Sequence, residues 1–229
     1  NDQTRNILTV EDPVEYAVPG IGQTQVNAKV GMTFAAGLRA ILRQDPDVVM
    51  VGEIRDRETA EIAVQASLTG HLVMSTVHTN SAVAAIARLR DMGVESYLLA
   101  STVSAIVAQR LVRRLCPHCK EAYEPDEAER RLLGLAEGEA VTLHRPVGCA
   151  HCKGLGYSGR RGVYELVVID DQIRTLIHDD AREADIARRA FQSRDTLYQA
   201  GVKLARDGVT SLAEVMRVCR EESERDAGV

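Results

Sequence analysis

The sequence predicts an α/β protein: an open parallel sheet, followed by a small cysteine-containing module and a helical tail. Three observations support this prediction. Short Val-rich runs alternate with segments of helical length in the amino-terminal half, two CxxC pairs follow, and from Asp170 onward the pattern is typical of helices only. We therefore expect three units, at residues 1–109, 110–164 and 165–229.

The predicted sheet contains strands that are buried on both faces. Its third strand is predicted at residues 71–78 (HLVMSTVH). Residues 7–11 (ILTVE) and 48–51 (VVMV) are short, rich in apolar residues and bounded by turn-forming residues. Runs of this kind are typical of parallel strands that are covered by helices on both sides. Residues 13–32 are expected to be irregular, because Pro19-Gly20 favours a turn.

Helices are predicted after the strands. Thr33 is placed to cap a helix that runs to Arg43, and Asp56 is placed to cap one that ends at Gly70. The other predicted helices span residues 81–92, 95–109, 170–178, 182–194, 196–207 and 211–222.

The composition argues against two classes of protein. The 229 residues are 45% hydrophobic and 27% charged with a net charge of −5, and aromatic residues make up only 3%. Nucleic-acid binders normally carry a basic surface and aromatic stacking platforms, so that class is disfavoured. No apolar run approaches the roughly 18–20 residues that span a membrane, and the first residues do not resemble a signal peptide.

The two CxxC pairs predict a metal site. CPHC at 116–119 and CAHC at 149–152 each present two thiolates on one tight turn, and two such knuckles complete a tetrahedral site for structural Zn²⁺. The predicted ligands are Cys116, Cys119, Cys149 and Cys152. Disulfides are the alternative, but without a secretion signal reduced cysteines are favoured. His118 and His151 lie inside the knuckles and could each replace a cysteine.

Acidic residues follow the first two strands. Glu53 comes directly after the run that ends at Gly52, and Glu11, Asp12 and Glu15 cluster where the first strand ends. Ligands of parallel α/β sheets bind beyond the carboxyl ends of the strands, so Glu53 stands where a nucleotide-hydrolysing site would hold Mg²⁺. A carboxylate of the cluster could accept a proton from a water that attacks a γ-phosphate. The alternative is a solvated loop.

Histidines and arginines supply further candidates. His78 ends the third strand among short polar residues, which suits phosphate sensing, whereas His71 is equally compatible with a structural hydrogen bond. Guanidinium groups suit phosphate, although salt bridges are the alternative for each. These arginines are Arg39, Arg43, Arg55 and, in a glycine loop expected to be flexible, Arg160 and Arg161.

Two absences bear on the extent of the chain. It begins at Asn1 rather than Met, and it contains no GxxxxGK[ST] phosphate-binding loop. We therefore expect these residues to be the carboxy-terminal part of a longer protein whose phosphate-binding loop lies upstream.

Taken together, these segments resemble the secretion ATPases of type II secretion systems and type IV pilus assembly. Residues 7–16 (ILTVEDPVEY) are similar to the aspartate box of this family, 45–56 (DPDVVMVGEIRD) to its Walker B segment and 69–80 (TGHLVMSTVHTN) to its histidine box. The CxxC pairs, followed by GRRGVYEL, resemble its tetracysteine zinc module. LVRRLCPHC and GVYELVVIDDQIR are most similar to the type II secretion ATPase.

The resemblance implies a RecA-like parallel sheet, here lacking the P-loop strand, in a ring of typically six identical subunits that uses ATP, Mg²⁺ and Zn²⁺. It implies a cytoplasmic ATPase, peripheral to the bacterial inner membrane, that drives pseudopilus assembly and protein export together with platform proteins of that membrane. Without the P-loop, these residues are expected to be inactive alone. The alternatives are a pilus-assembly ATPase, a non-catalytic zinc-containing docking module and, disfavoured by charge, a RecA-like nucleic-acid motor.

The resemblance also implies roles for single residues. Glu15 is implied to be the catalytic base and Glu53 the acid of the magnesium site, with Asp12 supporting the aspartate box. His78 is implied to sense the γ-phosphate, with His71 as a weaker partner. The arginines implied to contact the nucleotide or a neighbouring subunit are Arg39, Arg43, Arg55 and Arg160.

Overall fold

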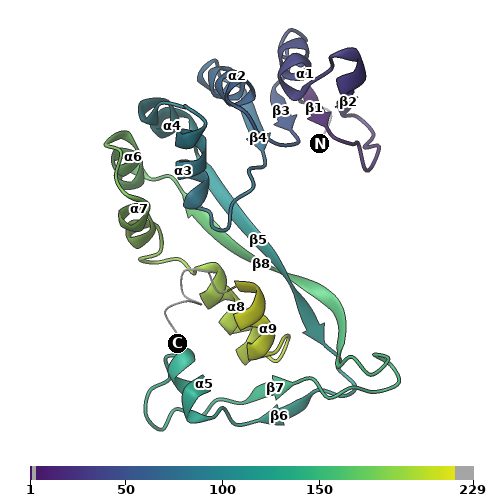
Figure 1. Ribbon diagram of the computed structural model, residues 1–229, viewed down its shortest axis with the longest axis vertical. Coiled ribbons are helices and arrows are strands. Elements are labelled where there is room, and N and C mark those ends of the chain that lie inside the picture. The colour runs from purple at the N-terminus through teal and green to yellow at the C-terminus, as the bar shows by residue number, and fades with distance from the viewer. Residues whose placement is uncertain (2–3, 220–229) are drawn as a thin grey trace. The chain divides into compact units, whose positions relative to one another are not determined.

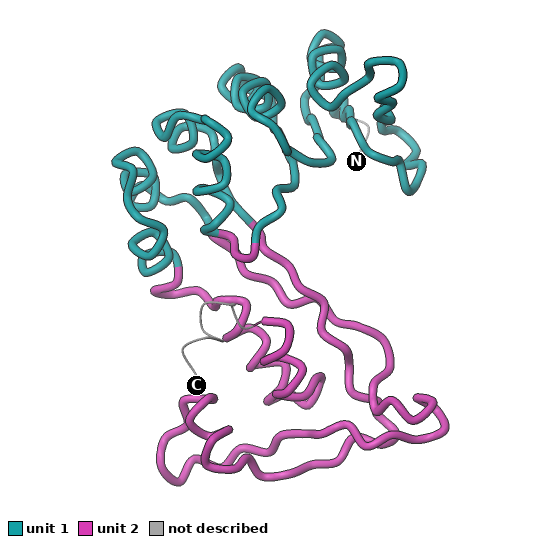
Figure 2. Tube along the Cα trace, viewed as in Figure 1, with its two compact units in different colours: residues 1–79, 83–106, 168–190 teal, residues 80–82, 107–167, 191–229 magenta. Residues whose placement is uncertain are grey.

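A computed structural model of the chain describes Asn1 and residues 4–219. Contacts divide the chain into two compact units (Figure 2): unit 1 comprises residues 1–79, 83–106 and 168–190, and unit 2 comprises residues 80–82, 107–167 and 191–229. The predicted division follows chain order, whereas each unit combines stretches that are distant in sequence. Within the described residues, no helix is long and apolar enough to cross a membrane.

Unit 1 contains a four-stranded parallel sheet in the order β2-β1-β3-β4 (Figure 1). Its strands are β1 (Ile7–Glu11), β2 (Gly22–Gln25), β3 (Val48–Val51) and β4 (Leu72–Ser75). The parallel sheet and the bounds of β1 and β3 are confirmed, while β4 is shorter than predicted. β2 corrects the prediction that residues 13–32 are irregular. Its GQTQ sequence has no apolar pattern because it is an edge strand that pairs with β1 through its backbone.

Helices accompany the strands of unit 1. They are α1 (Phe34–Ile41), α2 (Arg57–Leu68), α3 (Ala84–Asp91), α4 (Ser96–Thr102), α6 (Asp171–His178) and α7 (Glu183–Ala190), with a 3-10 turn at Ala28–Val30. As predicted, Thr33 caps α1 and Asp56 caps α2 through their side-chain oxygens. A Cβ atom on Gly37 would lie 2.9 Å from Val10 Cγ1, so glycine allows α1 to pack closely on β1.

A long two-stranded ribbon, most of it in unit 2, consists of β5 (Ala105–Leu115) and β8 (Tyr157–Val168), which run in opposite directions (Figure 1). Two predictions are wrong here. The helix predicted over residues 95–109 ends at Thr102, and β5 begins within its range. Pairing with the distant β8 decides the conformation of a segment whose apolar residues suit either structure. Arg160 and Arg161 lie in β8, not in a flexible glycine loop.

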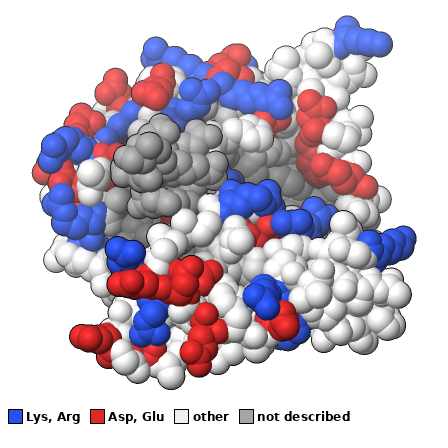
Figure 3. Space-filling model, turned by 60° about the horizontal axis from the view of Figure 1, so that its bottom comes forward, with Lys and Arg blue, Asp and Glu red and all other residues white. Residues whose placement is uncertain are grey.

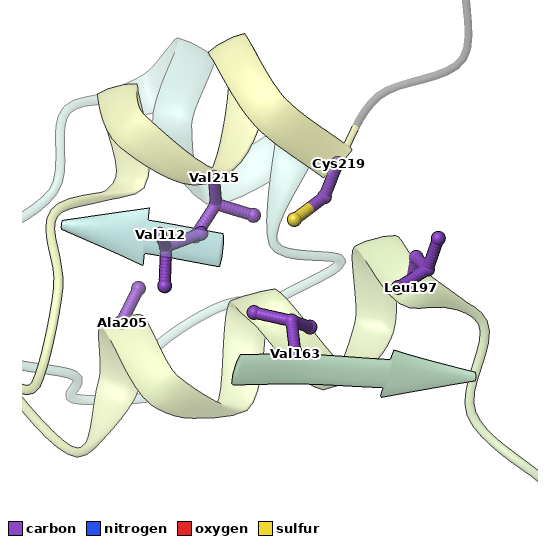
Figure 4. Packing of buried hydrophobic residues seen from close by; sticks show 6 residues of the cluster. All are labelled: Val112, Val163, Leu197, Ala205, Val215 and Cys219. Carbon is purple, nitrogen blue, oxygen red and sulfur yellow. The ribbon is translucent and has the colours of Figure 1, made fainter. Parts of the chain in front are cut away.

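One face of the ribbon packs on helices of unit 2. These helices are α8 (Leu197–Arg206) and α9 (Leu212–Cys219); residues 220–222 of the predicted last helix lie outside the described residues. The buried cluster at this contact consists of Val112, Val163, Leu197, Ala205, Val215 and Cys219 (Figure 4). Val163 and Glu165 of β8 are buried, whereas Tyr164 and Leu166 are exposed, as expected for a ribbon covered on one face.

The segment between β5 and β8 carries its own small elements. β6 (Glu121–Tyr123) pairs antiparallel with β7 (Leu143–Arg145), and α5 (Glu127–Leu132) lies between them in the chain. Asp126 and Glu129 form a capping box at the start of α5. Tyr123 donates a hydrogen bond to Glu129 at 2.7 Å, which ties this helix to β6.

A buried ion pair joins α9 to β5. Glu214 is 1% exposed and lies 2.7 Å from both Arg113 and Arg217. It also accepts the backbone N–H of Arg113 at 3.0 Å. Burial by itself raises the pKa of a carboxyl group, but Arg217 and Arg113 lower the pKa of Glu214 to about 2. The carboxylate therefore stabilises the folded state wherever it is ionised.

Replacing Glu214 by Gln is expected to lower the free energy of unfolding by about 3 kcal/mol at pH 7, because each tenfold change in proton affinity corresponds to about 1.4 kcal/mol. The stabilisation is present above the pKa of the unfolded carboxyl group and is lost as the pH falls toward about 2. Urea denaturation of both proteins at pH 7 and pH 3 measures the effect. An equal loss of stability at the two pH values contradicts it.

Candidate functional site

The carboxyl ends of β1 and β3 lie side by side, because the strands are parallel neighbours in which Val10 pairs with Val51. The N–H of Gly52 donates to the carbonyl of Val10 at 2.7 Å. Glu11 and Glu53 therefore leave the sheet at the same edge, where α/β sheets bind their ligands. Both residues are buried, each 8% exposed.

The carboxylate of Glu53 has two basic neighbours. Arg55 Nε–H donates to Oε2, and Nε2 of His78 lies 3.1 Å from the same oxygen. Burial raises the pKa of Glu53, but Arg55 and His78 hold it below its ordinary value, so the group is ionised at neutral pH. The His78 side chain is 81% exposed, which leaves its ring accessible to a ligand. The structure thus brings together three predicted site residues.

Asp12 and Glu15 lie on the loop that follows β1, and both are exposed. They share the carboxyl edge of the sheet with Glu53, because this loop begins where β1 ends. The buried acid of the same segment is Glu11, which accepts hydrogen bonds from Thr9 Oγ1 and Gln23 Nε2.

Gln23 was not among the predicted site residues. Its Nε2 donates to Glu11 at 2.9 Å and to the carbonyl of Tyr16 at 3.0 Å, while its Oε1 accepts the N–H of Val18 at 2.7 Å. This side chain of β2 therefore holds the loop that carries Glu15. The available signal in the sequence was the run of three polar residues, Gln23-Thr24-Gln25, directly after a glycine.

His71 lies at the opposite edge of the sheet. It precedes β4, and its Nδ1 lies 2.9 Å from the carbonyl of Ala66 and 3.1 Å from Thr69 Oγ1 at the end of α2. These contacts fit the alternative given for His71, a structural hydrogen bond, rather than a role at the phosphate. The structure does not bring His71 to the edge that holds Glu53.

The remaining predicted arginines lie apart from Glu53 or on the other unit. Arg39 of α1 is exposed and pairs with Glu58 at 2.7 Å. Arg43 follows α1 at the amino edge of the sheet, where Asn6 bonds to carbonyls of the same turn. Arg160 is exposed on β8 in unit 2.

The cysteines of the two CxxC pairs converge within unit 2. Their four sulfur atoms all lie within 4.8 Å of one another. The Sγ–Sγ distance is 3.9 Å between Cys116 and Cys149, 3.7 Å between Cys119 and Cys152, and 3.8 Å between Cys149 and Cys152. A disulfide bond is about 2.05 Å long, and all four thiols are free. The cluster is close enough to hold a metal ion.

Backbone N–H groups point at two of these sulfurs. Cys152 Sγ accepts from Cys149 N–H at 3.2 Å and from Gly156 N–H at 3.1 Å, and Cys119 Sγ accepts from Gly148 N–H at 3.3 Å. Burial raises the pKa of Cys152, but these donors and the neighbouring thiols lower it to about 6. Burial raises the pKa of Cys119 to about 11. The two N–H groups on Cys152 therefore favour its thiolate, the form that binds a cation.

The two knuckle histidines stack on each other. The ring centroids of His118 and His151 are 4.1 Å apart with an interplanar angle of 18°, and both residues are exposed. Within the described part of the chain, the group of side chains that could hold a metal consists of the four cysteines alone. The structure thus favours four cysteine ligands over the alternative in which a histidine replaces a cysteine.

Several known proteins are similar in sequence to this chain. The model of the type II/IV secretion system protein family matches residues 1–217. Type II secretion system protein E of Pseudomonas aeruginosa is 64% identical over 222 residues, and type II secretion system ATPase E of Vibrio cholerae is 57% identical over 221 residues. The alignments cover 97% and 96% of this chain but 44% of each relative. The chain therefore spans less than half the length of these relatives.

Solved structures share its fold. The pilus retraction motor PilT with bound ADP gives a TM-score of 0.68 at 28% identity, covering 97% of this chain and 55% of PilT. The Legionella pneumophila ATPase DotB gives a TM-score of 0.65 at 20% identity, covering 100% and 53%, and shows likeness of fold alone. With a family model that matches nearly its whole length, the chain belongs to the type II/IV secretion system protein family.

Proposed function

We propose that this chain is the carboxy-terminal part of an ATPase that couples ATP hydrolysis to pseudopilus assembly and protein export by a type II secretion system. The observation that carries the proposal is the buried Glu53 carboxylate beside Arg55 and His78 at the carboxyl edge of a parallel sheet. The proposal names a type II secretion system because the two relatives are named as proteins of such systems, and one of them is named an ATPase. Pilus assembly is the second candidate, because the similar PilT is a pilus motor.

The carboxyl edge of the sheet is the proposed place of ATP and Mg²⁺. Glu53 is the proposed acid of the magnesium site, acting through water, because an ionised carboxylate is the ligand type that Mg²⁺ prefers. When bound, the ion neutralises charge on the phosphates. His78 is proposed to sense the γ-phosphate, since its ring is exposed while its Nε2 contacts Glu53.

Glu15 is the proposed general base that accepts a proton from the attacking water, with Asp12 supporting the same loop. Gln23 is proposed to position this loop through its contacts with Tyr16 and Val18. The proposed contacts to nucleotide or to a neighbouring subunit are Arg39, Arg43, Arg55 and Arg160.

The cysteine cluster is proposed to bind one structural Zn²⁺. Four thiolates placed about 2.3 Å from a central ion form a tetrahedron with edges of about 3.8 Å. The shortest of the measured Sγ–Sγ distances is 3.7 Å and the longest pair lies within 4.8 Å, which supports this fit. Four protein ligands leave no open position, so the ion serves to cross-link the segment between β5 and β8.

The full-length protein is proposed to act as a homo-oligomer, with six subunits in the ring, in the cytoplasm at the inner membrane and in contact with platform proteins of the secretion system. Family membership supports this proposal. On the face drawn in Figure 3, basic and acidic side chains are interspersed. A nucleic-acid motor would instead carry a basic patch or stripe.

The 229 residues alone are expected to hydrolyse no ATP, whereas the full-length chain is expected to do so as an oligomer. These residues contain no GxxxxGK[ST] loop, whose backbone amides and Lys hold the β- and γ-phosphates. Phosphate release by both proteins at equal concentration measures the difference. Turnover by the 229 residues, free of contaminating ATPase, contradicts the assigned architecture. No turnover by the full-length oligomer contradicts the ATPase and favours a non-catalytic docking module.

Complementation separates the two candidate systems. The full-length gene is introduced into a strain that lacks its type II secretion ATPase and into one that lacks its pilus-assembly ATPase. Restored export without restored pili supports the type II proposal, and the reverse result replaces it with pilus assembly.

A further inference from the structure

The loop that carries His78 is held at its start by the segment that follows β3. Thr76 Oγ1 donates to the carbonyl of Gly52 at 2.6 Å, and the N–H of Ile54 donates to the carbonyl of Thr76 at 3.0 Å. These two bonds are made by Gly52 and Ile54, the residues on either side of Glu53 in the segment that follows β3. They fix a point two residues before His78 beside the carboxylate that His78 contacts.

The end of the same loop belongs to unit 2. Residues 80–82 are grouped with unit 2 by their contacts, whereas the residues on either side belong to unit 1. The N–H of Ala82 donates to Oε1 of Glu165 on β8 at 2.8 Å. Ala82 itself is 1% exposed. The chain after His78 is therefore fixed within unit 2 at two points, at Asn80 by Arg110 and at Ala82 by Glu165.

Glu165 has a second backbone partner. It is 3% exposed, and its Oε2 accepts the N–H of Leu197 at 2.9 Å. Leu197 is the first residue of α8, and the first N–H groups of a helix have no partner within that helix. One carboxylate thus satisfies N–H groups from two segments that are distant in sequence. Because an unbonded buried carboxylate is costly, the three segments are fixed together.

We infer that Glu165 is a positioning residue: through Ala82 it fixes the end of the loop that carries His78. The inference rests on the proposed ATPase function. His78 lies between an anchor in unit 1 at Thr76 and an anchor in unit 2 at Ala82.

The test uses Glu165→Gln in the full-length protein. Gln has nearly the same size but a single acceptor oxygen for the two N–H groups. We expect kcat for ATP to fall on the order of tenfold, the factor that corresponds to one lost hydrogen bond to a charged group. KM for ATP is expected to change by less than about twofold, because Glu165 does not bind the nucleotide. Glu165→Asp, which retains the charge but is too short to hold both N–H groups, is expected to give an intermediate kcat.

Glu214→Gln is the matched control. Glu214 is another buried carboxylate of unit 2, but the described partners of its carboxylate oxygens are Arg113 and Arg217 rather than the His78 loop. We expect this variant to lose stability while kcat of the folded protein stays within about twofold of wild type. Equal kcat losses in the Glu165 and Glu214 variants, or no loss in either, overturn the positioning role.

A second measurement does not depend on ATP hydrolysis. Hydrogen exchange of the nucleotide-free full-length protein is expected to become faster at residues 77–82 and at the start of α8 in Glu165→Gln, and to stay unchanged there in Glu214→Gln. Unchanged exchange in Glu165→Gln overturns the inference whether or not the protein hydrolyses ATP. Faster exchange in a full-length protein without ATPase activity contradicts the proposed function instead, and leaves Glu165 as the residue that holds this loop.

Discussion

Full-length protein carrying Glu15→Gln is expected to bind ATP but to hydrolyse it at least about 10²-fold more slowly than wild type, the scale expected for removing a general base. Glu15 lies on the exposed loop after β1, and Gln23 holds that loop at Tyr16 and Val18. The amide of Gln cannot accept a proton from the attacking water. Single-turnover hydrolysis and nucleotide binding, measured on the same preparation, separate loss of the base from loss of binding.

Glu53→Gln provides the contrast. Glu53 is buried and ionised beside Arg55 and His78, so its replacement is expected to change the dependence of hydrolysis on magnesium concentration. Neither variant is expected to support export, because the work requires turnover rather than binding. If Glu15→Gln hydrolyses ATP at the wild-type rate, the base lies elsewhere in the same segment, and Glu11 and Asp12 are the next residues to replace.

Removing zinc from the cysteine cluster is expected to unfold the segment between β5 and β8. Structural zinc contributes folding free energy on the order of 10 kcal/mol, and this segment otherwise has only a short strand pair and α5. We expect about one zinc per chain in the purified protein by metal analysis. Replacing Cys149 by Ser is expected to lower the zinc content and to expose residues 116–156 to proteolysis.

Cys219→Ser is the matched control for this experiment. Cys219 is a free, buried cysteine in the apolar cluster of α8 and α9, outside the metal cluster. Its replacement is expected to lower stability but to leave the zinc content unchanged. Purified reduced protein that contains no zinc, or that contains a disulfide between two of the cluster cysteines, contradicts the zinc proposal.

The strands buried on both faces could be predicted from the sequence alone. β1 and β3 were predicted with their observed bounds because strands that are buried on both sides are rich in apolar residues. β2 was missed, since an edge strand pairs through its backbone and places no such demand on its side chains. The helix predicted over residues 95–109 failed for a related reason: β5 is stabilised by pairing with β8, which lies far along the chain.

For the helices of the carboxy-terminal tail, too, the sequence predicts the elements but not their packing partners. All four helices predicted after Asp170 are present, because each has a distinct apolar face. Their partners could not be predicted: α6 and α7 belong to unit 1, whereas α8 and α9 belong to unit 2. An apolar face shows that a helix is covered, but it does not show by what.

The candidate site residues could be identified without a structure: the CxxC pairs, the acid after a Val-rich strand and the histidine after the next strand. Which of them lie close together depends on how the strands pair. Parallel pairing of β3 with β4 brings His78 to within 3.1 Å of Glu53 and leaves His71 at the opposite edge, because a strand rises about 3.3 Å per residue. Glu165 gave no signal in the sequence, since its partners are backbone N–H groups, which every residue except proline carries and which only folding brings within reach.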